Sequence, residues 1–185
     1  MSQAFPTKLQ EHYHFAKLAL FQFRVLARLQ AAIGSNEALD NLIECEAHRN
    51  NMSERPSLIN QSSFLQFAYI TLVWLWEAAG TEGQDGLLEE FERIAIRKNL
   101  KLPGRGQVHG DRQVGNWRAI IRLLRNAISH GKVVVSASLF RFEDINPGSE
   151  KSPTSLELSW ADLAQISETM LFAMTPVVYP QTIFE

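Results

Sequence analysis

The fold is decided by residues 116–132, which read NWRAIIRLLRNAISHGK. Apolar side chains recur there at the spacing of one helix face, namely Trp117, Ile120, Ile121, Leu124 and Ile128. Gly131 follows them, and glycine is the residue that most often ends a helix. The stretch therefore predicts an amphipathic helix over residues 116–130.

Basic and polar side chains occupy the other sides of this predicted helix. At about 100° per residue, a second stripe comprises Arg118, Arg122, Arg125 and Ser129. Asn126 and His130 are four residues apart and share a third side. Arginine binds phosphate through two parallel hydrogen bonds, and histidine exchanges protons near neutral pH. Arginine and histidine side chains together suit the metal-free cleavage of a phosphodiester. The helix dipole alone, however, also favours a cation at the C-terminal end of a helix.

Arg125 and His130 are five residues apart, which raises a geometric question. On an ideal helix their directions differ by about 140°, so the two side chains of one chain converge poorly unless the helix unwinds at His130. Pairing across a two-fold axis brings two copies of each residue to one cleft. This spacing favours a homodimer with the 116–130 helices near the axis.

The rest of the sequence predicts more helices and a short β element. Helices are expected over 7–33, over a second segment that follows Gly34-Ser35, over 57–79 and over 87–98. Gly80 is expected to cap the 57–79 helix. A last helix is expected to begin at Ser159, with Asp162 close to a capping box, and to end before Pro176. Short strands are expected over 133–135, 139–144 and 155–159, and a Gly-rich basic loop over 101–115. The predicted class is mainly α, a bundle of five to six helices with a small β-hairpin element after the 116–130 helix. The 7–33 helix is apolar nearly all round, which predicts burial by several neighbours or by a partner subunit.

Length and composition fit one globular unit. The 185 residues, 45% of them hydrophobic, predict a single domain over 1–185 with a strand-rich insert at about 132–160. The single cysteine, Cys45, predicts no intrachain disulfide and is expected to be a buried, inert thiol. No signal peptide and no apolar run of membrane-spanning length are evident, so a cytoplasmic protein without membrane contact is expected.

Charge is balanced overall and uneven along the chain. Residues 93–132 hold ten of the 18 basic residues and one acid, a net charge of +9 against −11 for the remainder. This asymmetry indicates that a polyanion binds to residues 93–132. The predicted phosphate contacts are Arg112, Arg118, Arg122 and Lys132. The alternative is a set of solvated helix faces paired with acids elsewhere. No convincing Cys-His pair or metal-ligand spacing is present, so neither a metal nor another cofactor is expected.

The string RNAISHG, residues 125–131, resembles the R-x4-6-H signature of the HEPN superfamily in its R-x4-H spacing. The chain is similar to stand-alone prokaryotic HEPN proteins, some of which are plasmid- or defence-associated. The resemblance implies a helical bundle that dimerises so that two motifs share a cleft. It also implies a metal-independent endoribonuclease that leaves 2′,3′-cyclic phosphate ends after attack by the 2′-hydroxyl of the RNA.

The resemblance assigns roles to three residues. It implies that Arg125 stabilises the phosphate and transition-state charge, that His130 transfers protons, and that Asn126 orients the site. The strand-rich insert departs from the simplest family pattern. Two functions follow: an RNA-cleaving toxin or defence nuclease, with an antitoxin protein as a further partner, or a non-catalytic HEPN module that binds a nucleotide or a protein partner.

Overall fold

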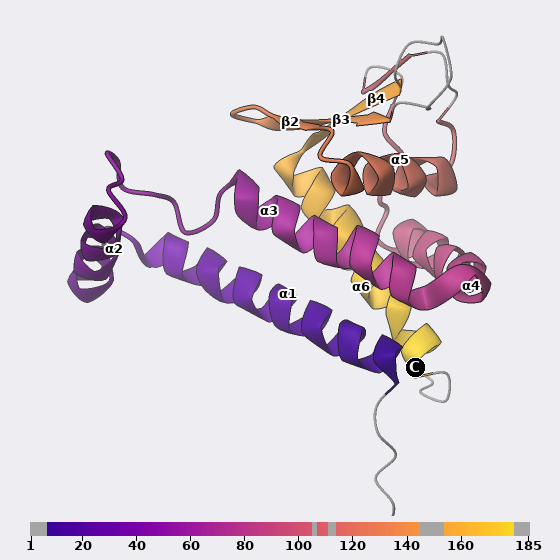
Figure 1. The fold of residues 1–185 in the computed structure, drawn as a ribbon, viewed down its shortest axis with the longest axis horizontal. Helices are drawn as coiled ribbons and strands as arrows, with labels where there is room; N and C mark the ends of the chain where they lie inside the picture. Colours follow the sequence, from indigo (N-terminus) through magenta and orange to yellow (C-terminus); the bar gives the residue numbers. More distant parts are fainter. Residues whose placement is uncertain (1–6, 105–106, 111–113, 145–153, 180–185) are drawn as a thin grey trace, which may run out of the picture.

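The computed structural model describes residues 7–104, 107–110, 114–144 and 154–179. In that part of the chain the protein is mainly α, with six α-helices, one π-helical segment and a small antiparallel sheet (Figure 1). The predicted fold class is therefore confirmed. The helices are α1 (Lys8–Ala32), α2 (Glu37–Arg49), α3 (Gln61–Ala68), the π-helix η1 (Tyr69–Trp74), α4 (Leu75–Arg97), α5 (Trp117–Ser129) and α6 (Trp160–Val178). The strands are β1 (Val108–His109), β2 (Val133–Val135), β3 (Leu139–Asp144) and β4 (Thr154–Ser159).

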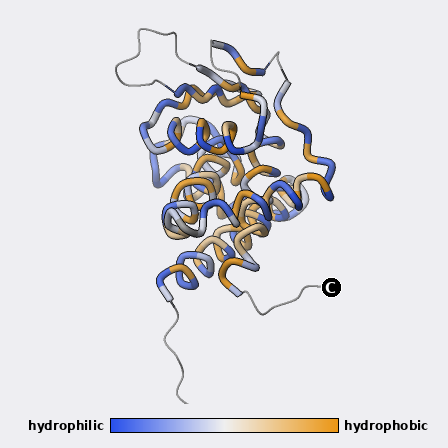
Figure 2. Tube along the Cα trace, turned by 90° about the vertical axis from the view of Figure 1, so that its right-hand side faces the viewer, coloured by the Kyte–Doolittle hydropathy of each residue, from blue (hydrophilic) through white to orange (hydrophobic). Residues whose placement is uncertain are grey.

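Helix α6 forms the centre of the bundle and packs against α1, α3 and α4. Most of its length is buried, because apolar side chains occur on nearly every side of it. The Ser159 hydroxyl accepts from the Asp162 N–H at 3.1 Å, so the predicted capping box is present. Figure 2 shows the hydrophobic residues gathered where the helices meet and the hydrophilic residues on the outer turns.

Three predicted helix ends differ from the structure. The helix expected over 87–98 begins earlier, since α4 is helical again directly after Gly80. Helix α6 continues through Pro176 to Val178, since a proline in the last turn removes only one N–H donor and the next turn still forms, with Tyr179 N–H bonded to Thr175 C=O at 2.9 Å. The expected 57–79 helix begins at Gln61, where the side chain of Asn60 caps it, and changes to the π-helix η1 before α4. Gly80 has φ of +66° and kinks α4 at the predicted break.

The sheet has the strand order β1-β4-β3-β2, with all pairs antiparallel. Phe140 pairs with Leu158 and Phe142 with Leu156, and all four side chains are fully or almost fully buried. This apolar inner face lies over α5, which separates the sheet from the rest of the bundle (Figure 1). Strand β1 lies within the predicted loop over 101–115, and its two residues are too few to give an alternating pattern.

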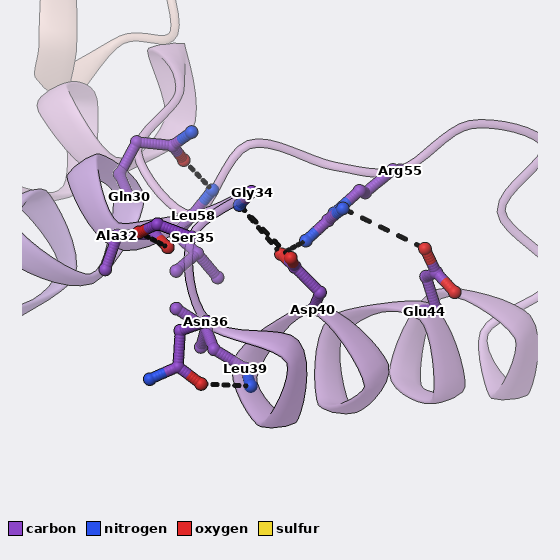
Figure 3. Close-up of polar contacts among 10 residues, drawn as sticks. All are labelled: Gln30, Ala32, Gly34, Ser35, Asn36, Leu39, Asp40, Glu44, Arg55 and Leu58. Atoms are coloured by element: carbon purple, nitrogen blue, oxygen red, sulfur yellow. Dashed lines mark hydrogen bonds and ion pairs between the residues drawn. The ribbon is translucent and has the colours of Figure 1, made fainter.

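Helix α2 stands apart from the bundle, at one end of α1 (Figure 1). A polar cluster joins α2 to the segments on either side of it: both Asp40 carboxylate oxygens accept from the Gly34 N–H, at 3.1 and 3.2 Å, and Arg55 forms an ion pair with Asp40 (Figure 3). The side chain of Cys45 on α2 is exposed, so the prediction of a buried thiol is wrong. Among the described residues α2 contributes none to the main core, and the side that carries Cys45 faces solvent.

Helix α1 buries only one face in the bundle. Its buried side chains are Tyr13, Ala16 and Leu20. An exposed apolar stripe runs along the other side and comprises Phe15, Leu18, Phe21, Val25 and Leu29. Among the described helices, none is long and apolar enough to cross a membrane.

Candidate functional site

Helix α5 is held between two layers, with β3 on one side and η1 on the other. It begins at Asn116, whose side-chain oxygen accepts from the Ala119 N–H at 2.8 Å. Its inner residues are buried and comprise Trp117, Ile120, Ile121, Leu123, Leu124 and Ala127. Two packed layers restrict rotation of the helix about its own axis, so the polar side chains between the inner positions have fixed directions.

The end of α5 fixes the place of His130. The Lys132 N–H donates to the Ala127 carbonyl at 2.8 Å, and the Gly131 N–H donates to the Ile128 carbonyl at 3.2 Å. This pair of bonds is a Schellman motif, in which Gly131 has the left-handed φ of +65°. His130 is the last residue of the turn and its side chain is exposed. The imidazole is therefore presented to solvent where the chain turns from α5 into β2.

Arg125 and Asn126 are linked to the sheet by a chain of hydrogen bonds. Arg125 Nη2 donates to Asn126 Oδ1 at 2.9 Å, and Asn126 Nδ2 donates to Asp144 Oδ1 at 3.3 Å. All three side chains are half-buried. The chain connects the polar side of α5 with the last residue of β3.

Asp144 is the residue of this cluster that the sequence did not predict. A signal for it exists in the strand pattern: residues 140, 142 and 144 point to the same face of β3, and Phe140 and Phe142 are fully buried against α5. A carboxylate at the end of an apolar inner stripe requires a polar partner. The alternation places Asp144 on this face, but the partner is known only from the packing of β3 on α5.

No hydrogen bond or ion pair joins Arg125 to His130 in the part of the chain that the structure describes. The structure therefore brings Arg125 and Asn126 together and leaves His130 as an exposed neighbour one turn further along. Within the described residues, no group of three or more His, Cys, Asp or Glu side chains could hold a metal ion.

The predicted phosphate contacts have different surroundings. Arg118 forms an ion pair with Asp85 on α4 at 2.7 Å, with both side chains mostly exposed. Arg122 and Lys132 are exposed. Arg112 lies outside the described residues. Arg122 and Lys132 thus present charge directly to solvent, whereas Arg118 shares its charge with an acid from the acidic remainder of the chain.

Other cations of the basic segment lie around a hollow of about 430 Å³ between α4 and α6. Arg93, Arg97, Lys98 and Phe172 are among its lining residues, and none of the predicted site residues lines it. Arg93 is paired with Glu90, and this bonding to the carboxylate raises the pKa of the guanidinium. Lys98 Nζ lies 3.9 Å from Glu168 Oε2 and 4.7 Å from the centre of the Phe172 ring. Two of these cations are therefore neutralised by acids outside residues 93–132.

Comparison with known proteins identifies a family. The family model described as HEPN pEK499 p136 matches residues 8–176. That range includes α5, the sheet and most of α6. No curated protein and no solved structure matched the chain.

Proposed function

The chain belongs to the HEPN pEK499 p136 family, and from this premise we propose that it is a metal-independent endoribonuclease. The single observation that carries the proposal is the R-x4-H motif at the end of α5. There Arg125 is half-buried and hydrogen-bonded while His130 is exposed on a fixed turn. A charge-stabilising group and a proton-transferring group thus lie on one rigid helix end, beside exposed basic side chains.

The reaction we propose uses the RNA itself as the nucleophile. The 2′-hydroxyl gives up its proton and its oxygen attacks the adjacent phosphorus, the bond from phosphorus to the 5′-oxygen breaks, and that oxygen takes a proton. The products are a 2′,3′-cyclic phosphate and a 5′-hydroxyl. His130 transfers protons in this scheme, and Arg125 stabilises the charge on the pentacoordinate phosphorus. Asn126 keeps Arg125 in place, through the bond at 2.9 Å.

The proposed enzyme is a homodimer. The five-residue spacing of Arg125 and His130, which directs the two side chains about 140° apart on a helix, supports a cleft to which two copies contribute. The exposed apolar stripe of α1 supports it independently, because five large side chains on one helix face are a surface that a partner can cover. The whole of 1–185 is proposed to be one domain, with the β2–β4 segment as a layer over α5 in place of a separate unit.

RNA is proposed to lie along the exposed cations of α5 and the turn that follows it. Arg122 and Lys132 are available as phosphate contacts, and Arg118 becomes one when RNA competes with Asp85. Arg112 is proposed as a fourth contact. The biological role we propose is that of a toxin or defence nuclease, with an antitoxin protein as its other partner.

The test is incubation of the purified chain with an RNA pool in a chelator, followed by analysis of the new ends. Cyclic phosphate and 5′-hydroxyl ends are expected. A matched RNA with a 2′-deoxy sugar at the mapped cut site should resist, because the nucleophile is missing. Cleavage of the deoxy substrate would refute the mechanism. No cleavage of any RNA would favour the non-catalytic module that binds a nucleotide or a protein.

A further inference from the structure

Asp144 lies where the strand layer meets the polar side of α5. It is the last residue of β3 and shares the inner face of that strand with Phe140 and Phe142. Its neighbour Glu143 points to the opposite face, where it pairs with Arg141 at 3.2 Å. The Asp144 carboxylate is thus hydrogen-bonded to α5, whereas the ion pair of Glu143 lies within β3.

The contact between Asp144 and Asn126 determines how the Asn126 amide is oriented. A guanidinium has only donors, and an ionised carboxylate has only acceptors. Asn126 therefore bonds to both only when its oxygen faces Arg125 and its NH₂ faces Asp144, as the distances of 2.9 and 3.3 Å show. Turning the amide by 180° would place two donors together on one side and two acceptors together on the other.

We propose that Asp144 is a positioning residue for RNA cleavage, acting on Arg125 through Asn126. The inference rests on the proposed function. The carboxylate holds the amide in the one orientation that accepts from Arg125, and that bond fixes one edge of the guanidinium. The bond to Asn126 uses one of the five N–H donors of Arg125, so the others remain to bind the phosphate. Strand β3 thus contributes a positioning residue to the site.

Positioning has a kinetic signature that a purely structural contact lacks. A guanidinium aligned with the charge that develops on phosphorus stabilises the transition state more than the bound substrate. Loss of its alignment should lower kcat and leave KM almost unchanged. Loss of a contact that only docks the sheet should instead lower the stability of the fold, with kcat retained in the folded fraction.

The experiment compares Asp144→Ala, Asp144→Asn, Glu143→Ala, Asn126→Ala and the double variant Asn126→Ala/Asp144→Ala in the full chain. The substrate is one fluorescent RNA whose cut site has been mapped with the wild type. We expect D144A to lower kcat on the order of tenfold, with KM within about twofold, as misplaced catalytic groups do. D144N should retain most of kcat, since its amide oxygen can still accept from Asn126. E143A, the matched control, should stay within about twofold of the wild type. In the N126A background, D144A should add no further loss in kcat, because the proposed effect of Asp144 on Arg125 passes through Asn126.

A measurement on the wild type keeps the inference testable if D144A does not fold. The NMR signals of the Asn126 side-chain NH₂ should show slowed hydrogen exchange with water, because the amide is hydrogen-bonded to both Arg125 and Asp144. Three results would overturn the role of Asp144 and leave the proposed function standing. They are an equal kcat in D144A and E143A, a kcat as low in D144N as in D144A, and additive losses of kcat in the double variant. An Asn126 side-chain NH₂ that exchanges as fast as an unbonded amide would overturn that role too. If the wild type cleaves no RNA, the proposed function fails and the positioning role of Asp144 fails with it, whereas slowed exchange of the Asn126 NH₂ would show that the contact itself exists.

Discussion

The Lys132 N–H donates to the Ala127 carbonyl across the end of α5, at 2.8 Å, and this bond encloses the turn that carries His130. The turn requires a left-handed residue at position 131, where glycine has φ of +65°. The place of the exposed imidazole therefore depends on the one residue that follows it.

Gly131→Ala should destabilise the protein by about 1 kcal/mol, because an L-residue is strained at positive φ. Urea unfolding measures the change. Gly115→Ala is the matched control, since Gly115 does not have a positive φ and a Cβ there would meet no atom within 4 Å. A G131A variant as stable as G115A would contradict the role of the left-handed turn.

His130→Ala and Arg125→Ala should each lower kcat for RNA cleavage by at least about 100-fold, the range expected for a lost acid–base or charge-stabilising group. Steady-state cleavage of a fluorescent RNA measures the loss. His48→Ala changes an exposed histidine on α2 and should cleave like the wild type. Full activity in H130A would remove histidine from the mechanism.

Charge reversal on α5 should weaken RNA binding. In Arg118→Glu/Arg122→Glu, the dissociation constant should rise at least about tenfold at 0.1 M salt. The slope of log affinity against log salt should also become shallower, since fewer counterions are released. Fluorescence anisotropy over a salt series measures both. Arg49→Glu, on the separate helix α2, is the control. An equal loss of RNA affinity in that variant would show that binding depends on the net charge of the protein and not on the surface of α5.

Leu18→Glu should convert a dimer into a monomer if the α1 stripe lies in the interface, because a buried unpaired carboxylate is costly there. Light scattering at micromolar concentration should give one chain mass, 21.0 kDa, for the variant and twice that mass for the wild type. Ile96→Glu changes the most exposed of the large apolar side chains, on α4, and should remain a dimer. A wild type that is monomeric would exclude the shared cleft.

The carboxyl of Asp40 should titrate below its ordinary value of 3.8. The hydrogen bond from the Gly34 N–H lowers the pKa first, and the bond from Arg55 lowers it further. A pKa that is lower in the folded than in the unfolded chain adds stability above the unfolded pKa, and this stability is lost as pH falls through the folded pKa. Carbon NMR of the Asp40 carboxyl measures the midpoint. Arg55→Ala should raise it, and Arg49→Ala, which removes the partner of Glu46, should leave it in place.

The sequence predicted those parts of the fold that depend on neighbours along the chain. Helix α5 has an apolar stripe, a capping asparagine and a terminal glycine within 16 residues, and strands β2 and β3 lie where alternation placed them. The π-helix η1 was not predicted, since its apolar run fits an ordinary helix equally well. Strand β1 was not predicted because two residues form a strand only when β4 is beside them.

The site depends more on contacts between distant segments. The motif named Arg125, Asn126 and His130, but the bond from Asn126 to Asp144 joins residues 18 apart and exists because β3 lies over α5. The pairing of Arg118 with Asp85 likewise required α4 to lie beside α5. Periodicity identifies the face on which such residues lie, and tertiary packing alone identifies their partners.

The separation of α2 from the bundle gives the protein two levels of local stability. Ile43 and Ala47 are buried, yet neither belongs to the main core, whereas α5 is buried between two layers. Opening α2 exposes little apolar surface compared with unfolding the bundle, so its amide hydrogens exchange with solvent through local opening. The amides of α5 should exchange only when the sheet and the bundle come apart, because α5 packs between them. Helix α2 is therefore expected to open locally while α5 stays folded.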